Sequence, residues 1–328
     1  MERARWAPVV ALLVLAPWAA EASWGGFPVT WYPLLILFLG PLYGGAAVLI
    51  REAARRSGGG WPVIVLLAAA FGVVQAGLVD QSLFNPGFLD DTEFAGSAPG
   101  FAEKALDYVG NHVLLSICAP IMLVEAFLRT PYRHRPWLGG RGLLGVGVLY
   151  LLGSLMIFAD DEDGRKGFVL SPAQLGLAVA VIVALVGVAL LPRWRRTPRP
   201  GVGWVPHPLL FGSVLLAVHI GLWFATGRLG VGVRVAVVVA AVVLVPAWSR
   251  RAGWSPRHVV AGWSAGLIAA AAGAAFAPAY VPTSTVLGVV SDLAVVVLAG
   301  ALAAGAYRRV VSERSDGRDV RAEYGDAP

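Results

Sequence analysis

The chain contains few charged residues and almost no cysteine. Of its 328 residues, only 14% are Asp, Glu, Lys or Arg, whereas about 25% is typical of soluble domains. So few charges could not cover the water-facing surface of a soluble protein of this length. The single cysteine, Cys118, excludes an intrachain disulfide and any metal site that needs several thiolates.

Lysine is also scarce, because 24 of the 26 basic residues are arginine. Together with 40 glycines, 22 prolines and abundant alanine and valine, this usage is typical of GC-rich bacterial genomes. We therefore expect a bacterial protein, and the apolar runs described next lead us to expect it in the cytoplasmic membrane. The net charge of +6 does not predict nucleic-acid binding, because the placement of the arginines along the chain has another explanation, given below.

Long apolar runs are what the sequence has in abundance. Hydrophobic residues make up 57% of the chain and the mean hydropathy is +0.70. The runs have the length of about 20 residues that crosses a lipid hydrocarbon core as a helix. We predict an all-α polytopic bundle, with an integral membrane domain over 1–306, a disordered cytoplasmic tail over 307–328 and lipid as its main partner. Ten spans are expected, at 7–22, 31–50, 61–79, 108–128, 142–159, 172–191, 209–226, 229–248, 259–279 and 285–306.

The loop charges predict the orientation of these spans. With the N-terminus placed in the cytoplasm, 21 of the 26 basic residues fall in inner segments and five in outer ones. This is the bias of the positive-inside rule, and one missing or extra span would scramble it. Both termini are therefore predicted to be cytoplasmic.

The first apolar run leaves two alternatives open. Its basic start, short apolar stretch and Ala20-Glu21-Ala22 are typical of a cleaved signal peptide. Pro17 and Trp18 interrupt the stretch where a signal peptide would be uniformly apolar, which favours a retained helix. Cleavage would leave nine spans and the same topology.

Small residues and charged pairs predict how some helices pack. Gly40 and Gly44 form a GxxxG motif, and a second stripe has a small residue at every fourth position, which allows close helix approach. Its members are Gly262, Gly266, Ala270 and Ala274. Near the predicted inner ends, Glu52 precedes Arg56 and Glu125 precedes Arg129 by four residues, which predicts two pairs along single helices.

Polar side chains inside the predicted spans are the candidate functional residues, because such groups are costly in lipid unless they have partners or a role. The topology places all of them in the outer half of the membrane. We hypothesise that they line an outward-facing pocket for the binding or transport of a small polar or ionic ligand. They are Glu21, Gln75, Asp80, His112, Ser116, His219, Arg234 and Asp292.

Each of these residues also has a purely structural explanation. Arg234 can extend toward the membrane surface, Asp292 can pair with Arg234, and a single membrane histidine is often simply hydrogen-bonded. A non-catalytic scaffold, in which the polar groups fix helix register, is therefore an alternative. Ten spans would divide into two inverted halves of five, as in many transporters, but the sequence contains no convincing internal repeat.

Enzymatic chemistry has less support in the sequence. His112 and His219 have no close metal-binding spacing such as HExxH. Ser116 and His112 lie four residues apart on one helix, a poor geometry for a nucleophile and its base. The sequence predicts no metal site and no cofactor, and it favours a role other than catalysis.

Two resemblances extend these expectations. The block YGGAAVLIREAARRSGGGWPVIVLLAAAFGVVQAGLVDQSLFNP, followed by NHVLLSICAPIMLVEAF, resembles a group of uncharacterised bacterial, actinobacterial-type multi-pass membrane proteins. The helix at Gln75-Ala76 followed by a membrane histidine is also similar to the CAAX-protease and bacteriocin-processing (CPBP) intramembrane proteins. Tyr108-Val-Gly-Asn-His112 resembles the FxxxH motif of that family. Its paired glutamates are replaced by Gln75 and Ala76, which cannot act as bases, so this resemblance implies a catalytically degenerate relative.

Overall fold

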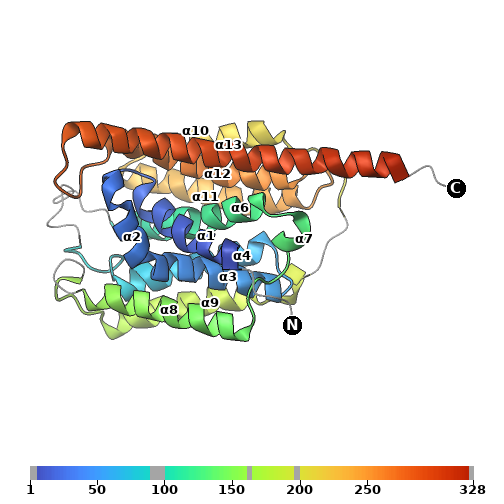
Figure 1. Ribbon diagram of the computed structural model, residues 1–328. Helices are drawn as coiled ribbons and strands as arrows, with labels where there is room; N and C mark the ends of the chain where they lie inside the picture. Colours follow the sequence, from blue (N-terminus) through green and yellow to red (C-terminus); the bar gives the residue numbers. More distant parts are fainter. Residues whose placement is uncertain (1–5, 89–99, 161–164, 196–199, 325–328) are drawn as a thin grey trace.

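The chain forms an all-α bundle (Figure 1), and the computed structural model describes residues 6–88, 100–160, 165–195 and 200–324. In these ranges the β-structure is limited to one isolated bridge between Gly201 and Arg251. The predicted fold class is confirmed. The α-helices are α1 (Trp6–Pro17), α2 (Tyr32–Leu39), α3 (Gly45–Arg56), α4 (Trp61–Val74), α5 (Phe101–Lys104), α6 (Ala119–Phe127), α7 (Thr130–Arg133), α8 (Gly140–Ala159), α9 (Pro172–Ala189), α10 (Pro208–Leu222), α11 (Gly227–Ser249), α12 (Pro256–Gly273) and α13 (Thr285–Tyr324).

Each predicted span coincides with an apolar helix in the described residues. Eight helical segments are long and apolar enough to cross a membrane, and two shorter apolar helices, Trp6–Ala22 and Pro208–Leu222, accompany them. The protein therefore has the helices of a multi-pass membrane protein. The count of ten spans and the cytoplasmic position of the termini remain predictions.

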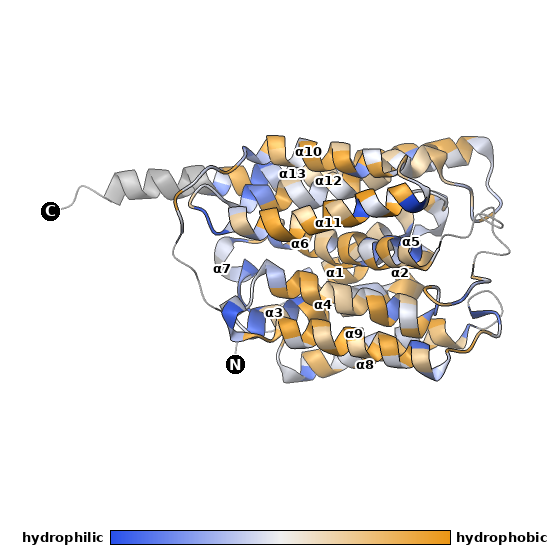
Figure 2. Ribbon diagram, turned by 180° about the vertical axis from the view of Figure 1, so that it is seen from behind, coloured by the Kyte–Doolittle hydropathy of each residue, from blue (hydrophilic) through white to orange (hydrophobic). Residues whose placement is uncertain are grey.

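The helices lie roughly side by side in a bundle with an inner group and two flanks. In Figure 1, α8 and α9 line one side, α10 and α13 line the other, and α1, α3, α4 and α6 lie between them. Hydrophobic residues run along the helices, while hydrophilic residues gather toward their ends and loops (Figure 2).

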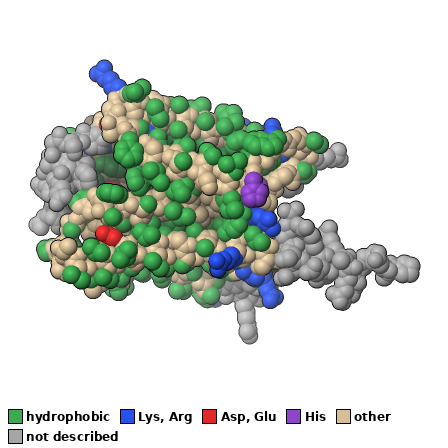
Figure 3. All heavy atoms as spheres, turned by 90° about the horizontal axis from the view of Figure 1, so that it is seen from above, with side chains coloured by type: hydrophobic (Ala, Val, Ile, Leu, Met, Phe, Trp, Pro, Cys, Tyr) green, Lys and Arg blue, Asp and Glu red, His purple; other side chains and the backbone are tan. Residues whose placement is uncertain are grey.

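The flanking helices turn large apolar side chains outward. The exposed fraction is 64% at Leu151 of α8 and at Val183 of α9, and 67% at Val297 of α13. The face over α10 and α13 is largely hydrophobic, and most of its visible Lys and Arg side chains lie toward one end (Figure 3). An apolar surface of this extent fits contact with lipid.

Small residues allow the close packing that the sequence predicts. A Cβ on Gly40 would lie 2.9 Å from the carbonyl oxygen of Leu13 in α1, and one on Gly44 would collide with the Cα of the same residue. In α12, a Cβ on Gly262 would lie 3.0 Å from the Phe211 ring of α10. Both glycine motifs therefore lie at helix contacts.

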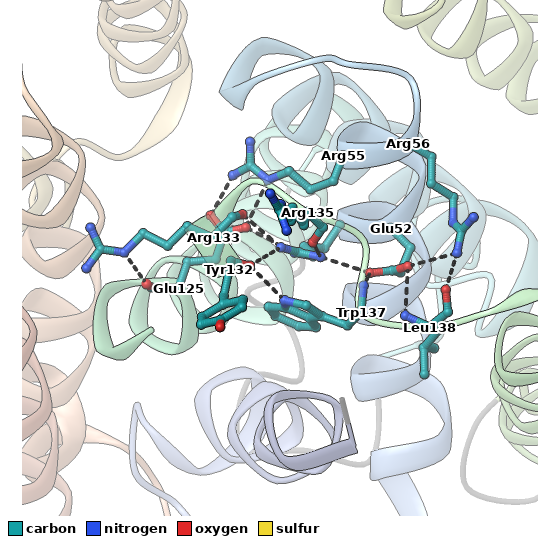
Figure 4. A network of polar contacts seen from close by, with 10 residues as sticks. Glu52, Arg55, Arg56, Glu125, Tyr132, Arg133, Arg135, Trp137 and Leu138 are labelled. Carbon is teal, nitrogen blue, oxygen red and sulfur yellow. Dashed lines mark hydrogen bonds and ion pairs between the residues drawn. The ribbon is translucent and has the colours of Figure 1, made fainter. Parts of the chain in front are cut away.

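A buried ion network holds one end of the bundle together (Figure 4). Arg51 is fully buried and donates to Glu52 at 2.8 Å and to Glu125 at 3.0 Å. It also donates to the backbone carbonyls of Tyr132, Arg133 and Arg135. We call this set, with Arg55 and Arg56, the Arg51 network.

The carboxylates of the Arg51 network fix the segment that connects α7 to α8. Glu52 accepts the backbone N–H groups of Trp137 at 2.7 Å and Leu138 at 3.3 Å. The predicted Glu52–Arg56 pair is present at 3.4 Å. The prediction that Glu125 pairs with Arg129 is wrong, because Glu125 pairs with Arg51 and Arg55 from α3, which reach it across the helix contact.

The last helix extends past the predicted end of the membrane domain. α13 continues beyond 306 to Tyr324, and Glu313 on it pairs with Arg133 at 2.8 Å. The beginning of the predicted tail is therefore helical and held against α7. That the remainder forms a disordered cytoplasmic tail stays a prediction.

Candidate ligand-binding site

Among the described residues, five segments of π-helix interrupt the α-helices in the first half of the chain, and they carry four of the eight candidate residues. The π-helix accounts for well under about 1% of residues in proteins and occurs often at functional sites. Glu21, Gln75, His112 and Ser116 all lie in such segments. The five segments are η1 (Trp18–Ala22), η3 (Gly40–Gly44), η4 (Gln75–Val79), η5 (Ala105–Val109) and η6 (His112–Cys118).

Glu21 and Tyr43 join two of these segments. The Tyr43 hydroxyl donates to Glu21 Oε1 at 2.5 Å, which links η1 to η3. The carboxyl group of Asp80 lies close enough to both residues for direct electrostatic interaction. Two carboxyl groups and a phenol therefore come together from three separate helices.

Gln75 lies beside Asp80 and leaves one buried atom without a partner. Its Nε2 donates to Asp80 Oδ2 at 3.2 Å, while its Oε1 is buried without a hydrogen bond among the described residues. A buried polar atom without a partner costs about 1–3 kcal/mol. The next residue after Asp80, Gln81, has a φ of 59°, an unusual backbone for a non-glycine residue. This segment combines an unpaired acceptor with a sparsely populated conformation, as functional sites often do.

His112 and Ser116 complete the cluster from the side of η6. His112 Nδ1 and Ser116 Oγ lie 3.0 Å apart, one turn from each other. The imidazole ring lies 5.8 Å from the Tyr43 ring and 5.6 Å from the Phe71 ring, measured between centroids. We refer to Glu21, Tyr43, Gln75, Asp80, His112 and Ser116 as the polar cluster.

The polar cluster is buried on one side and partly open on the other. Gln75 is 2% exposed and Ser116 is 1% exposed, whereas Glu21, Asp80 and His112 keep partial exposure. Burial raises the pKa of the Asp80 carboxyl, which follows the Trp61–Val79 span, to about 6. Small changes in the surroundings of Asp80 can therefore change its protonation state near neutral pH.

The cluster lies at the opposite end of the bundle from the Arg51 network. The Trp61–Val79 span starts a few residues after Arg56, which belongs to the network, and ends beside Asp80. If the network end faces the cytoplasm, as the loop charges predict, the polar cluster lies in the outer half of the membrane.

Three of the predicted site residues lie elsewhere. Arg234 forms an ion pair with Asp107 of η5 instead of Asp292. His219 packs at the contact between α10 and α12, where its Nε2 would lie 2.8 Å from a Cβ on Gly266. Asp292 lies within electrostatic range of Tyr32. These three residues make structural contacts, and the remaining five predicted residues come together.

Sequence reasoning missed Tyr43 and Phe71. An aromatic residue in an apolar span is ordinarily part of the core, so neither position stood out. The neighbouring Gly40-Pro41 pair was a usable signal, because proline frees backbone groups and marks helix irregularities. Proline at that position coincides with the π-segment η3, which carries Tyr43.

The donor groups of the cluster suit hydrogen bonding and charge recognition. In the described residues, no group of three or more His, Cys, Asp or Glu side chains is arranged to hold a metal ion. The unpaired acceptor and the two carboxyl groups can instead accept hydrogen bonds from a bound molecule. Comparison with protein-family models, curated proteins and solved structures finds no match to this chain.

Proposed function

We propose that the protein binds a small polar ligand at the polar cluster, as a step in moving that ligand into or across the membrane. The observation that carries this proposal is the buried, unpartnered Oε1 of Gln75 beside the two carboxyl groups. Binding sites commonly combine mostly apolar surroundings with a few convergent polar groups. Here those groups come from four of the π-segments and from Asp80.

The surrounding bundle supports a ligand that enters from one face. Glu21, Asp80 and His112 keep partial exposure, whereas the Arg51 network closes the other end with buried ion pairs. With the orientation predicted from the loop charges, the entrance faces the cell exterior. Discontinuous helices around a polar site within the membrane are a common design of secondary transporters.

Thiol chemistry tests whether water-soluble molecules reach the cluster. The natural Cys118 is fully buried, so a Cys118→Ala background removes the only thiol. In it we would place Gln75→Cys, Ser116→Cys or Leu115→Cys and measure the modification rate of the purified protein in detergent. The reagents are 2-aminoethyl and 2-sulfonatoethyl methanethiosulfonate. Leu115 is the matched control, because it neighbours Ser116 and is 4% exposed in an apolar cluster.

We expect at least one reagent to modify the Gln75→Cys and Ser116→Cys variants about tenfold faster than the Leu115→Cys variant. This result would show that water-soluble reagents reach the polar cluster although Gln75 and Ser116 are buried. Equal, slow modification at all three positions would overturn the proposal and favour a scaffold whose polar groups only fix helix register. Retained folding is checked by gel filtration of each variant.

A catalytically degenerate relative of the CPBP proteins is the second candidate. It is favoured by the placement of His112, whose ring contacts Phe71 on the same helix that carries Gln75. Histidine and the residues at the two glutamate positions would then be neighbours, as that resemblance implies. Because Gln75 and Ala76 cannot act as bases, this candidate also predicts binding without hydrolysis.

A further inference from the structure

We infer that the ligand of the polar cluster is a small organic cation with a primary ammonium group. This inference rests on the proposed function and names the chemical class of the ligand. It rests on the unpaired acceptor oxygen of Gln75, on the two neighbouring carboxyl groups of Glu21 and Asp80, and on the aromatic rings beside them.

The charge of the cluster is acidic. The carboxyl group of Glu21 lies within electrostatic range of that of Asp80, and neither forms an ion pair with Lys or Arg among the described residues. The buried Lys104 donates to the backbone carbonyls of Ser82 and Asn85. Two neighbouring carboxylates without a counter-ion attract a cation and repel an anion.

The hydrogen-bonding groups of the cluster are short of donors. Among the described residues, the buried Gln75 Oε1 has no hydrogen-bond partner, and Glu21 accepts from the Tyr43 hydroxyl at its Oε1. Asp80 accepts from the Gln75 side chain and from Ser82. A primary ammonium group has three N–H donors and no acceptor, which matches three acceptor side chains.

Aromatic rings beside the carboxyl groups favour an organic cation over a hydrated metal ion. Phe71 lies 6.4 Å from Tyr43 and 6.3 Å from Tyr150 between ring centroids. Such rings stabilise ammonium groups through cation–π attraction and pack against the attached carbon chain. A divalent ion would require more oxygen or nitrogen ligands in fixed positions than the cluster provides.

Two methanethiosulfonate reagents of opposite charge test this inference separately from the proposed function. On the Ser116→Cys variant, the rate with the aminoethyl reagent is compared with the rate with the sulfonatoethyl reagent, each divided by its rate on free cysteine. We expect a preference of about tenfold or more for the cationic reagent. The added change Glu21→Gln should remove most of that preference, whereas Asp292→Asn, outside the cluster, should leave it unchanged.

Protection by a free ligand gives a second, independent measurement. Methylammonium chloride should slow modification of the Ser116→Cys variant, and sodium chloride of equal ionic strength or neutral acetamide should not. Rapid modification by both reagents without charge preference would overturn the inference and leave the proposed function standing. Protection by acetamide would do the same and indicate a neutral ligand. Failure of both reagents to reach the cluster would overturn the inference and the proposed function together.

Discussion

Replacing Arg51 by methionine should destabilise the protein more than any change at an exposed arginine. The side chain is fully buried and makes two bonds to carboxylates and three to backbone carbonyls. Removing one partner of a buried ion pair costs about 3–5 kcal/mol, because the other charge stays buried. Glu125 would keep Arg55, and Glu52 would keep two backbone N–H donors. We therefore expect the lower part of that range, about 3 kcal/mol.

Cys118 provides the assay for this prediction. It is the only thiol in the chain and is fully buried, so a thiol-reactive dye reports unfolding during titration of mixed micelles with sodium dodecyl sulfate. Arg56→Met is the matched control, because Arg56 binds the same Glu52 at 3.4 Å with a side chain that is 39% exposed. We expect that control to cost less than about 1 kcal/mol.

Equal destabilisation by the two changes would refute this account of the network. So would an Arg51→Met variant within about 1 kcal/mol of the wild type. Either result would mean that water or neighbouring side chains compensate the two carboxylates, and that the Arg51 network does not hold this end of the bundle.

Two further predictions concern stability: the first uses the same dye assay, and the second uses tryptophan fluorescence during the same titration, because a thiol reacts too slowly with the dye below about pH 6. Gly44→Val should destabilise the protein by about 1–3 kcal/mol or more, because the added atoms collide with the backbone of Leu13. Gly145→Val is the control and should change stability little, because a side chain there meets nothing within 4 Å. Equal effects of the two changes would contradict the proposed packing of Gly44 against α1. Because burial raises the pKa of Asp80 from 3.8 to about 6, its contribution to the free energy of unfolding should be greatest below about pH 4 and be lost as the pH rises through 6. Asp80→Asn should abolish this part of the pH profile, and an unchanged profile would show that Asp80 is solvated in the fold.

The positions of the helices could be predicted because the length of an apolar run determines whether it can cross a membrane. The predicted spans 142–159 and 172–191 correspond closely to α8 (Gly140–Ala159) and α9 (Pro172–Ala189). The π-segments could not be predicted in this way. In a helix that is apolar on all sides, the extra residue in the turn of a π-segment does not change the hydrophobic pattern of the sequence.

The sequence predicts how far along its helix each candidate residue lies, but not the side of the helix to which its side chain points. His219, Arg234 and Asp292 lie on apolar helices like the members of the polar cluster, yet they face other contacts. Span boundaries fix how deep a residue lies and leave the rotation of each helix undetermined. For the same reason the partner of Glu125 was mispredicted, because pairing along one helix competes with partners from a neighbouring helix.

The π-segments also divide individual helices into two parts whose side chains follow different angular registers about the helix axis. One residue beyond the α-helical count turns everything after it by roughly 100° about the helix axis. In the Trp61–Val79 span, the side chains before Gln75 and those after it therefore follow different angular registers. Deleting a single residue within η4 would restore an unbroken α-helix, leave the packing of α4 against α9 in place and swing Asp80 away from Glu21. The part of this helix before Gln75 therefore packs against α9, while the π-segment sets the direction in which Asp80 lies.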